Sequence, residues 1–208
     1  MVFKDVETSE DLWWLFTETE TSAAYYTGRK ILEDLGYIIL SVTGDGFMGI
    51  RSAFSGISFQ MCQVHMERLV INGTTRRPQL EAGQVLLALI RTIHKTNKRI
   101  FMRRLDLYIE KYREFLNQKS IAPETGVSFW THKNLRKAVM SLQRFAPYLF
   151  AYETDKDIPK TTNAPEGHFS HIKDVLRVHR GLSRKQKEKV INTILLASTI
   201  APRKKKFG

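Results

Sequence analysis

A single aspartate between two glycines, in the segment Gly44-Asp45-Gly46, is the first residue of this chain that could do chemistry. The segment follows a β-rich run over residues 37–42, which predicts that Asp45 lies where a strand ends. In an open α/β sheet, ligands bind at the carboxyl ends of strands, and flanking glycines let a substrate or a metal ion approach closely. The alternative interpretation is a plain Gly-Asp-Gly turn. Asp45 is therefore a candidate ligand or catalytic acid.

A Cys-x-x-His pair, Cys62 and His65, ends the next expected strand over residues 58–64. As half of a zinc site it lacks partners, because the chain has one cysteine and its other histidines show no matching spacing. A thiol-protease pairing would need a cleft that a sequence does not reveal. The simpler interpretation is a buried cysteine and a half-buried histidine that order the strand end or support a nearby site.

Glu166 is a second candidate carboxylate, at the start of an expected helix that follows residues 161–165. At 100° per residue, Lys173 and Arg177 fall within about 20° of Glu166 on the helical wheel, and Arg180 falls within about 40°. A glutamate near a helix start interacts favourably with the helix dipole, so a capping charge is the simpler explanation. The row of cations favours a second explanation for Glu166, in which the cations bind phosphates beside a metal-binding carboxylate.

The order and spacing of these segments resemble those of bacterial insertion-sequence transposases of the Mutator-like group, in the acidic-triad (DDE) superfamily. The resemblance extends over about residues 13–196. It depends on four segments in this order: Gly44-Asp45-Gly46, the Cys62/His65 pair, residues 161–166 and the His-Arg-Gly-Leu segment at 179–182.

The resemblance implies an RNase H-like sheet interrupted by an all-helical insertion. Residue by residue, Asp45 matches the second catalytic acid of the family and Glu166 the third. Cys62 and His65 match its C/D-x-x-H pair, which has no settled catalytic role. The implied activity is DNA strand cleavage and transfer with Mg²⁺ or Mn²⁺, ions for which carboxylates are suitable ligands, bound as a pair about 4 Å apart. Asp45 and Glu166 would bind the metal, and Lys173, Arg177 and Arg180 would bind DNA.

The first strand of that fold, with its aspartate, is not found upstream of Asp45. The upstream acids of note are Asp5, Asp11, Glu18 and Glu20, and Asp5, which follows a possible strand remnant, has the place of the end of the second strand rather than the first. We therefore expect the C-terminal part of a transposase that is inactive alone, with a homo-oligomer or an N-terminal portion as its partner. Two alternatives stay open. One is an active enzyme whose first acid lies elsewhere or on another chain, and the other is a non-enzymatic, basic nucleic-acid-binding protein derived from a transposase.

Charge supports a polyanionic partner. The 33 lysines and arginines exceed the 21 aspartates and glutamates, so the net charge is +12. Residues 1–57 hold 4 basic and 9 acidic side chains, whereas residues 58–208 hold 29 and 12, a net charge of +17. Nucleic acid is the first candidate for such a partner, and a protein that is merely basic is the alternative.

The composition also excludes several classes of protein. No apolar run approaches the roughly 18 residues of a membrane-spanning helix, and the acidic start does not match a secretory signal. One cysteine excludes an internal disulfide framework. These features predict a cytoplasmic, nucleoid-associated protein with no membrane partner.

The elements that must position these residues are α/β in type. Strands over residues 12–16, 37–42 and 58–64 alternate with helices over residues 23–35 and 47–54, an order that implies an α/β layer with parallel pairing. Helical periodicity then appears over residues 85–93, 101–116 and 135–149, and again over 163–180 and 183–198, with loops at 123–126 and 159–165. We expect a partial RNase H-like core over residues 1–65, a helical insertion over 66–155, the rest of the core over 156–199 and a basic tail over 200–208.

Overall fold

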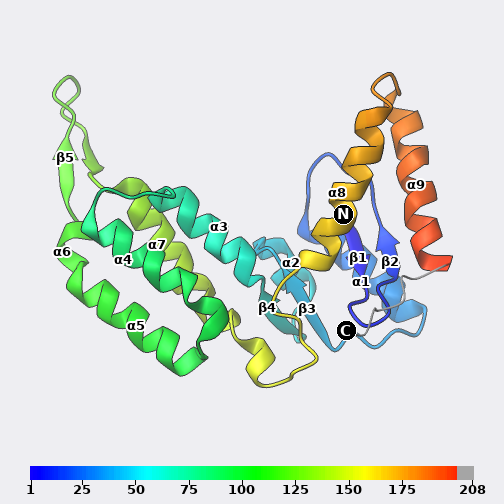
Figure 1. The fold of residues 1–208 in the computed structure, drawn as a ribbon, viewed down its shortest axis with the longest axis horizontal. Coiled ribbons are helices and arrows are strands. Elements are labelled where there is room, and N and C mark those ends of the chain that lie inside the picture. Colours follow the sequence, from blue (N-terminus) through cyan, green and yellow to red (C-terminus); the bar gives the residue numbers. More distant parts are fainter. Residues whose placement is uncertain (201–208) are drawn as a thin grey trace. The chain divides into compact units, whose positions relative to one another are not determined.

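The structure is a computed structural model that describes the backbone of residues 1–200 and the side chains of these residues except 163–166, 168 and 200. Most of the expected basic tail thus lies outside the described residues. The fold is mixed α/β and mainly helical, which confirms the expected class at that level (Figure 1). The chain divides into two compact units. Unit 1 contains Met1–Val42, Phe47–Ile57 and the chain from Thr162 onward, and unit 2 contains Thr43–Gly46 and Ser58–Thr161.

Unit 1 combines a short hairpin with four helices. Strand β1 (Val2–Lys4) pairs antiparallel with β2 (Asp11–Trp14). Helix α1 (Ser22–Asp34) begins after Thr21, whose side chain accepts a hydrogen bond from the backbone N–H of Ala24. The remaining helices are α2 (Met48–Ala53), α8 (Asn163–Val178) and α9 (Arg184–Ile200).

Aromatic rings hold the core of unit 1 together. The ring of Phe3 lies 4.9 Å from that of Trp13 and 5.6 Å from that of Phe54, measured between centroids. The indole N–H of Trp14 donates to the side-chain oxygen of Asn192 at 2.7 Å, which ties β2 to α9. The aromatic run expected to form a buried strand forms a strand only as far as Trp14. Its apolar residues up to Trp14 are half-buried and Leu15 and Phe16 are exposed, so the expectation of a buried strand is wrong.

Unit 2 consists of a small sheet and a block of helices that follows it in the sequence. Strand β3 (Ser41–Gly44) pairs with β4 (Ser58–Met61). Helix α3 packs against α7 and α4, and α4 packs against α5. The elements after β4 are α3 (Gln63–Thr74), α4 (Glu81–Arg91), η1 (Ile93–Lys95), α5 (Lys98–Lys111), α6 (Arg113–Leu116), β5 (Lys119–Ile121), β6 (Ser128–Trp130), α7 (Lys133–Phe145), η2 (Ala146–Tyr148) and η3 (Ala151–Glu153).

The helical periodicities found in the sequence are confirmed, because α4, α5 with α6, and α7 cover the three expected segments. Each buries one stripe of apolar side chains, as in α7, where Leu135, Val139 and Leu142 are buried. Two elements were not expected. Helix α3 occupies residues assigned in part to a strand, and the β5–β6 hairpin surrounds the loop expected at 123–126.

The expected layer of parallel strands is wrong for residues 12–16. Strand β2 pairs antiparallel with β1, and β3 and β4 form a separate two-stranded sheet. A hairpin between neighbours closes a short loop, so its entropic cost is lower than that of a distant pairing. The strand expected over residues 37–42 begins only at Ser41, and Ile38 and Leu40 before it are exposed.

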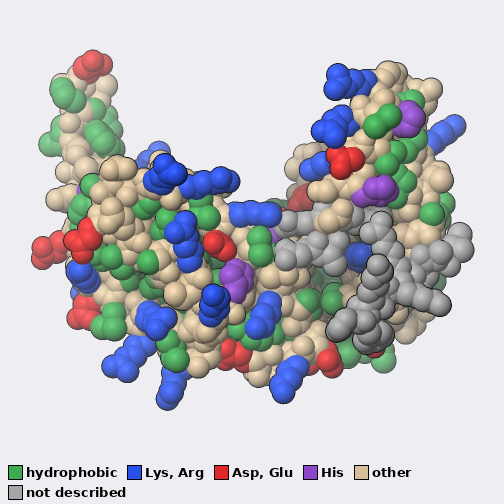
Figure 2. Space-filling view, viewed as in Figure 1, with side chains coloured by type: hydrophobic (Ala, Val, Ile, Leu, Met, Phe, Trp, Pro, Cys, Tyr) green, Lys and Arg blue, Asp and Glu red, His purple; other side chains and the backbone are tan. Residues whose placement is uncertain are grey.

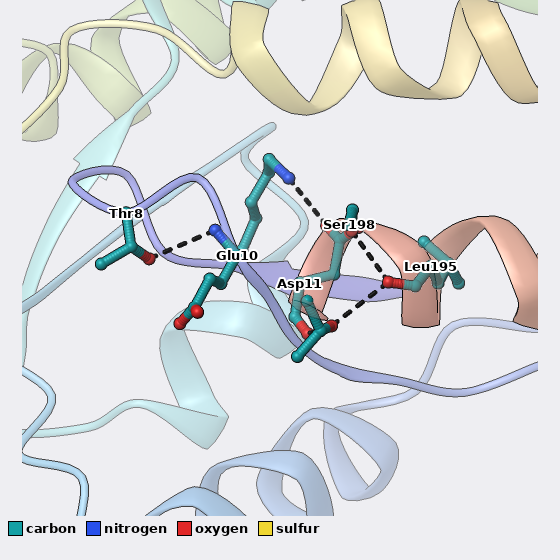
Figure 3. Close-up of polar contacts among 7 residues, drawn as sticks. Thr8, Glu10, Asp11, Leu195 and Ser198 are labelled. Atoms are coloured by element: carbon teal, nitrogen blue, oxygen red, sulfur yellow. Dashed lines mark hydrogen bonds and ion pairs between the residues drawn. The ribbon is translucent and has the colours of Figure 1, made fainter. Parts of the chain in front are cut away.

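A buried carboxylate links the hairpin of unit 1 to its last helix (Figure 3). Asp11 is 1% exposed and lies 3.0 Å from the ammonium group of Lys4. The hydroxyl of Ser198 donates to its carboxylate, and that of Thr199 donates to its backbone carbonyl at 3.0 Å. Asp11, an acid upstream of Asp45, therefore has a structural role here.

We expect Lys4→Met to lower the free energy of unfolding by about 3–5 kcal/mol, because it removes one partner of a buried ion pair. Urea unfolding followed by tryptophan fluorescence measures this change. Lys30→Met is the control, because Lys30 pairs with Glu33 at the surface and its loss should leave stability unchanged. The double variant Lys4→Met/Asp11→Leu should recover most of the loss. Equal stability of wild type and Lys4→Met would contradict this account of Asp11.

Candidate functional site

The Gly44-Asp45-Gly46 segment follows β3, as the sequence predicts. Gly44 ends the strand and is buried, whereas Asp45 is exposed. Gly46 has a φ of +91° and lies against the core of unit 2: a Cβ there would be 2.7 Å from the sulfur of Met61 and 3.2 Å from the ring of Phe145. The turn is therefore a packed feature of the fold.

Cys62 and His65 lie at the start of a helix and not in a strand. Strand β4 ends at Met61, and Cys62 is the N-cap residue of α3. The expectation of a strand to residue 64 is wrong, because the positions that α3 buries (Gln63, Met66, Val70 and Thr74) recur every three or four residues, as on one face of a helix. Cys62 is fully buried and His65 half-buried, which agrees with the simpler interpretation of this pair.

Backbone hydrogen bonds bring three distant segments of unit 2 together at this strand-to-helix corner. The N–H of Cys62 donates to the carbonyl of Gly44 at 2.7 Å, and the N–H of Gln63 donates to that of Lys160 at 3.0 Å. The hydroxyl of Thr43 donates to the carbonyl of Pro159 at 3.1 Å. The corner thus joins the chain at Gly44 to the chain just before residues 161–166, and these are the segments that the resemblance groups.

Gln63 organises the polar contacts beneath the corner, and sequence reasoning did not single it out. Its side-chain amide is buried and donates to the carbonyl of Leu149 at 2.9 Å. Its amide oxygen lies 3.2 Å from Nδ1 of His94, whose Nε2 lies 3.1 Å from the carboxylate of Glu67. Burial raises the pKa of Tyr152, and a hydrogen bond to Gln63 opposes this rise. The available signal was a glutamine within an apolar segment.

Glu166 lies in the first turn of α8, but its side chain lies outside the described residues. Its placement beside Asp45 stays a prediction. Lys173 and Arg177 are exposed on α8, and Arg177 contacts Asp174 at 3.4 Å. The expectation that Arg180 belongs to the same row of cations is wrong, because the helix ends at Val178. The backbone of His179 (φ −101°, ψ 60°) has already left the helical region.

A metal site likewise stays a prediction. Among the described side chains, which do not include Glu166, no group of three or more His, Cys, Asp or Glu residues lies close enough to hold a metal ion. Asp45 is the described residue that the resemblance assigns to the metal.

Among the charged side chains on the surface of unit 2, cations outnumber acids, as the face drawn in Figure 2 shows. Residues 58–161 contain 18 lysines and arginines and 9 acids, and 17 of the basic side chains are exposed. Helix α7 has four basic residues and no acidic one. Three of the four, which we call the α7 stripe, lie within about 40° on the helical wheel, opposite the buried face. They are Lys133, Lys137 and Arg144.

We expect Gly46→Ala to lower the free energy of unfolding by about 2–4 kcal/mol. A left-handed backbone costs a non-glycine residue about 1–2 kcal/mol, and the contacts with Met61 and Phe145 add an overpacking cost. Gly126→Ala is the matched control, because Gly126 also has a positive φ (+66°) but nothing within 4 Å of its Cβ position. Urea unfolding followed by circular dichroism compares the two. Equal losses would show that Met61 and Phe145 move aside.

Comparison of this chain with protein-family models, with curated proteins and with solved structures found no match. Within residues 1–200, no helix is both long and apolar enough to cross a membrane. The geometry of the site and the distribution of charge therefore carry the functional argument.

Proposed function

We propose that this chain is a DNA-binding protein of the transposase type. The observation that supports DNA binding best is the α7 stripe, a row of exposed cations on a helix with no acid. A helix rises 1.5 Å per residue, so Lys133 and Arg144 lie about 16 Å apart along α7. Cations at this spacing can contact several phosphates of one DNA duplex.

The surface charge of unit 2 extends this argument beyond one helix. Helix α5 carries Lys98, Arg99, Arg103, Arg104 and Lys111 against two acids. A surface with this excess of cations attracts a polyanion at long range and binds it with little dependence on sequence. Lys173, Arg177 and Arg180 are a second candidate DNA-binding surface, in unit 1.

The transposase type rests on the resemblance, which implies an RNase H-like catalytic core with a helical insertion. The corner formed by Gly44, Cys62 and Lys160 supports it, because two of the family's segments meet there with the chain just before the third. In such a core, Asp45 and Glu166 would hold Mg²⁺ or Mn²⁺, ions that activate a nucleophile and stabilise the leaving oxygen in strand cleavage. Because only two of the three acids are identified in this chain, DNA binding is the part of the function that we assign to the chain alone.

The alternative is a non-enzymatic nucleic-acid-binding protein that shares the transposase scaffold. The exposed cations favour both functions equally, so cleavage is the property that separates them.

We expect duplex DNA binding to weaken steeply between about 50 and 200 mM salt, with little dependence on sequence. Lys137→Gln/Arg144→Gln should lower the slope of log K against log salt by about 2, because each lost phosphate contact removes about 0.9. Fluorescence anisotropy with a labelled duplex measures both effects. Lys173→Gln/Arg177→Gln/Arg180→Gln, measured in the same way, gives the contribution of the second surface.

The matched control is Lys30→Gln/Lys156→Gln, which removes the same charge at places where acids surround the lysine. Lys30 pairs with Glu33, and Lys156 lies between Asp155 and Asp157. This control should keep the wild-type slope. If the α7 variant keeps it as well, α7 does not face DNA.

A second measurement addresses catalysis. We expect the purified chain with Mn²⁺ to nick supercoiled plasmid DNA no faster than its Asp45→Asn variant, because two carboxylates are too few for the two-metal site of the family. Gel electrophoresis of the plasmid over time gives the rates. Robust nicking by the wild type that disappears in Asp45→Asn would show that this protein assembles a complete set of acids.

A further inference from the structure

A cleft of about 560 Å³ lies within unit 2, beside the β5–β6 hairpin. Residues 73–75 and 77–80, from the end of α3 through the loop before α4, line it together with Gly83 of α4. Residues 129–135, from β6 into α7, line the rest. Its volume is within the range of small-molecule sites in proteins, so it has room for a nucleotide.

The cleft offers an aromatic ring to an incoming ligand. Phe129 lines it and is 48% exposed, so a ligand can reach it. The next residue, Trp130, is half-buried, with the guanidinium of Arg136 at 4.0 Å and the ammonium of Lys119 at 4.7 Å from its ring centroid. These two cations hold the indole of Trp130 in place.

The cleft is also selective in charge. Arg77 and Lys133 line it and are exposed, and none of the described residues that line it is an aspartate or a glutamate. Lys133 is at the same time the first member of the α7 stripe. A chain of phosphates that leaves the cleft at Lys133 therefore meets further cations at Lys137 and Arg144.

We propose that this cleft binds single-stranded DNA, with a base stacked on Phe129 and the flanking phosphates held by Arg77 and Lys133. Base stacking on an aromatic ring tolerates every base, and a cationic track that follows the backbone completes the common mode of single-strand binding. This inference rests on the proposed function, because it names the form of DNA that one part of the basic surface takes.

Two other ligands fit the cleft less well. In a duplex, each base is already stacked and paired, so no free base face is available to Phe129. An acidic peptide would pair with Arg77 and Lys133, but its carboxylates would leave the ring of Phe129 without a flat partner.

The test uses the full chain and two labelled probes, a single-stranded oligothymidylate of roughly 15 nucleotides and a blunt duplex of the same length. We expect Phe129→Ala to weaken single-strand binding by roughly 5- to 100-fold, the range for loss of one base stack, and to leave duplex binding within about twofold. Phe129→Tyr should restore single-strand binding. Ile121→Ala is the matched control, because Ile121 is an exposed apolar residue of the same hairpin that does not line the cleft.

Arg77→Gln should lower the salt slope for the single strand and leave the slope for the duplex unchanged. Equal loss of both probes in Phe129→Ala, or loss of neither, would overturn the inference, whereas duplex binding by the wild type would still support the proposed function. Competition by polyglutamate as strong as that by unlabelled oligothymidylate would overturn it in favour of an acidic protein partner. If the wild type binds neither probe, the proposed function is overturned, and the inference with it.

Discussion

The carbonyl oxygen of Leu149 accepts two hydrogen bonds from buried glutamine side chains, and unit 2 depends on this arrangement. Gln60 and Gln63 each donate to it at 2.9 Å, and the backbone N–H of Tyr152 donates to the side-chain oxygen of Gln60 at 3.3 Å. Residues that are almost 90 positions apart in the sequence are thereby held at one point. A shift of either end of the helical block would break these hydrogen bonds, and each buried amide left unsatisfied would cost about 1–3 kcal/mol. Gln63 also belongs to the corner that joins Gly44, Cys62 and Lys160, because its backbone N–H donates to the carbonyl of Lys160.

Close packing carries this constraint to the other end of the block. A Cβ at Gly73 would be 2.6 Å from Cβ of Ala138 and 2.9 Å from the carbonyl of Asn134, so α3 and α7 approach as closely as two backbones can. Gly73 and Asn134 also line the cleft beside the hairpin. The close contact between α3 and α7 therefore positions two of the residues that line the cleft. The same contact directs the solvent-facing side of α7, with Lys133, Lys137 and Arg144, away from the core.

The parts of this structure that the sequence predicts are those determined by local periodicity. The apolar spacing predicts helices α4, α5 and α7, and α1 covers the helix expected over residues 23–35. The pairing of strands was not, because strands of three or four residues leave too short a pattern to specify a partner. The loop at 123–126 was expected, but the short β-rich runs on either side of it were not assigned to strands, so the β5–β6 hairpin was missed. Of the candidate site, Asp45 and the Cys62/His65 pair could be located from the sequence. Gln63 left only a weak signal, a glutamine within an apolar segment, and its partners depend on tertiary contacts that no local pattern encodes.

Some cations of this chain pair with acids, as Lys111 of α5 does with Glu81, whereas those of α7 have no acid on their own helix. In unit 1, Lys4 pairs with Asp11, Arg29 with Glu33, and Arg184 with both Glu18 and Glu188. Helix α7 of unit 2 has no acid at all, so its cations have no carboxylate within one turn of the helix. Like charges on one surface repel each other and destabilise a compact fold slightly, and a polyanion relieves that repulsion when it binds. The apolar stripe of α7, which includes Leu135, Val139 and Leu142, offsets the repulsion in the absence of a ligand. Helix α7 can therefore carry Lys133, Lys137 and Arg144 on its exposed side, beside Met140, because apolar packing holds the opposite side in the core.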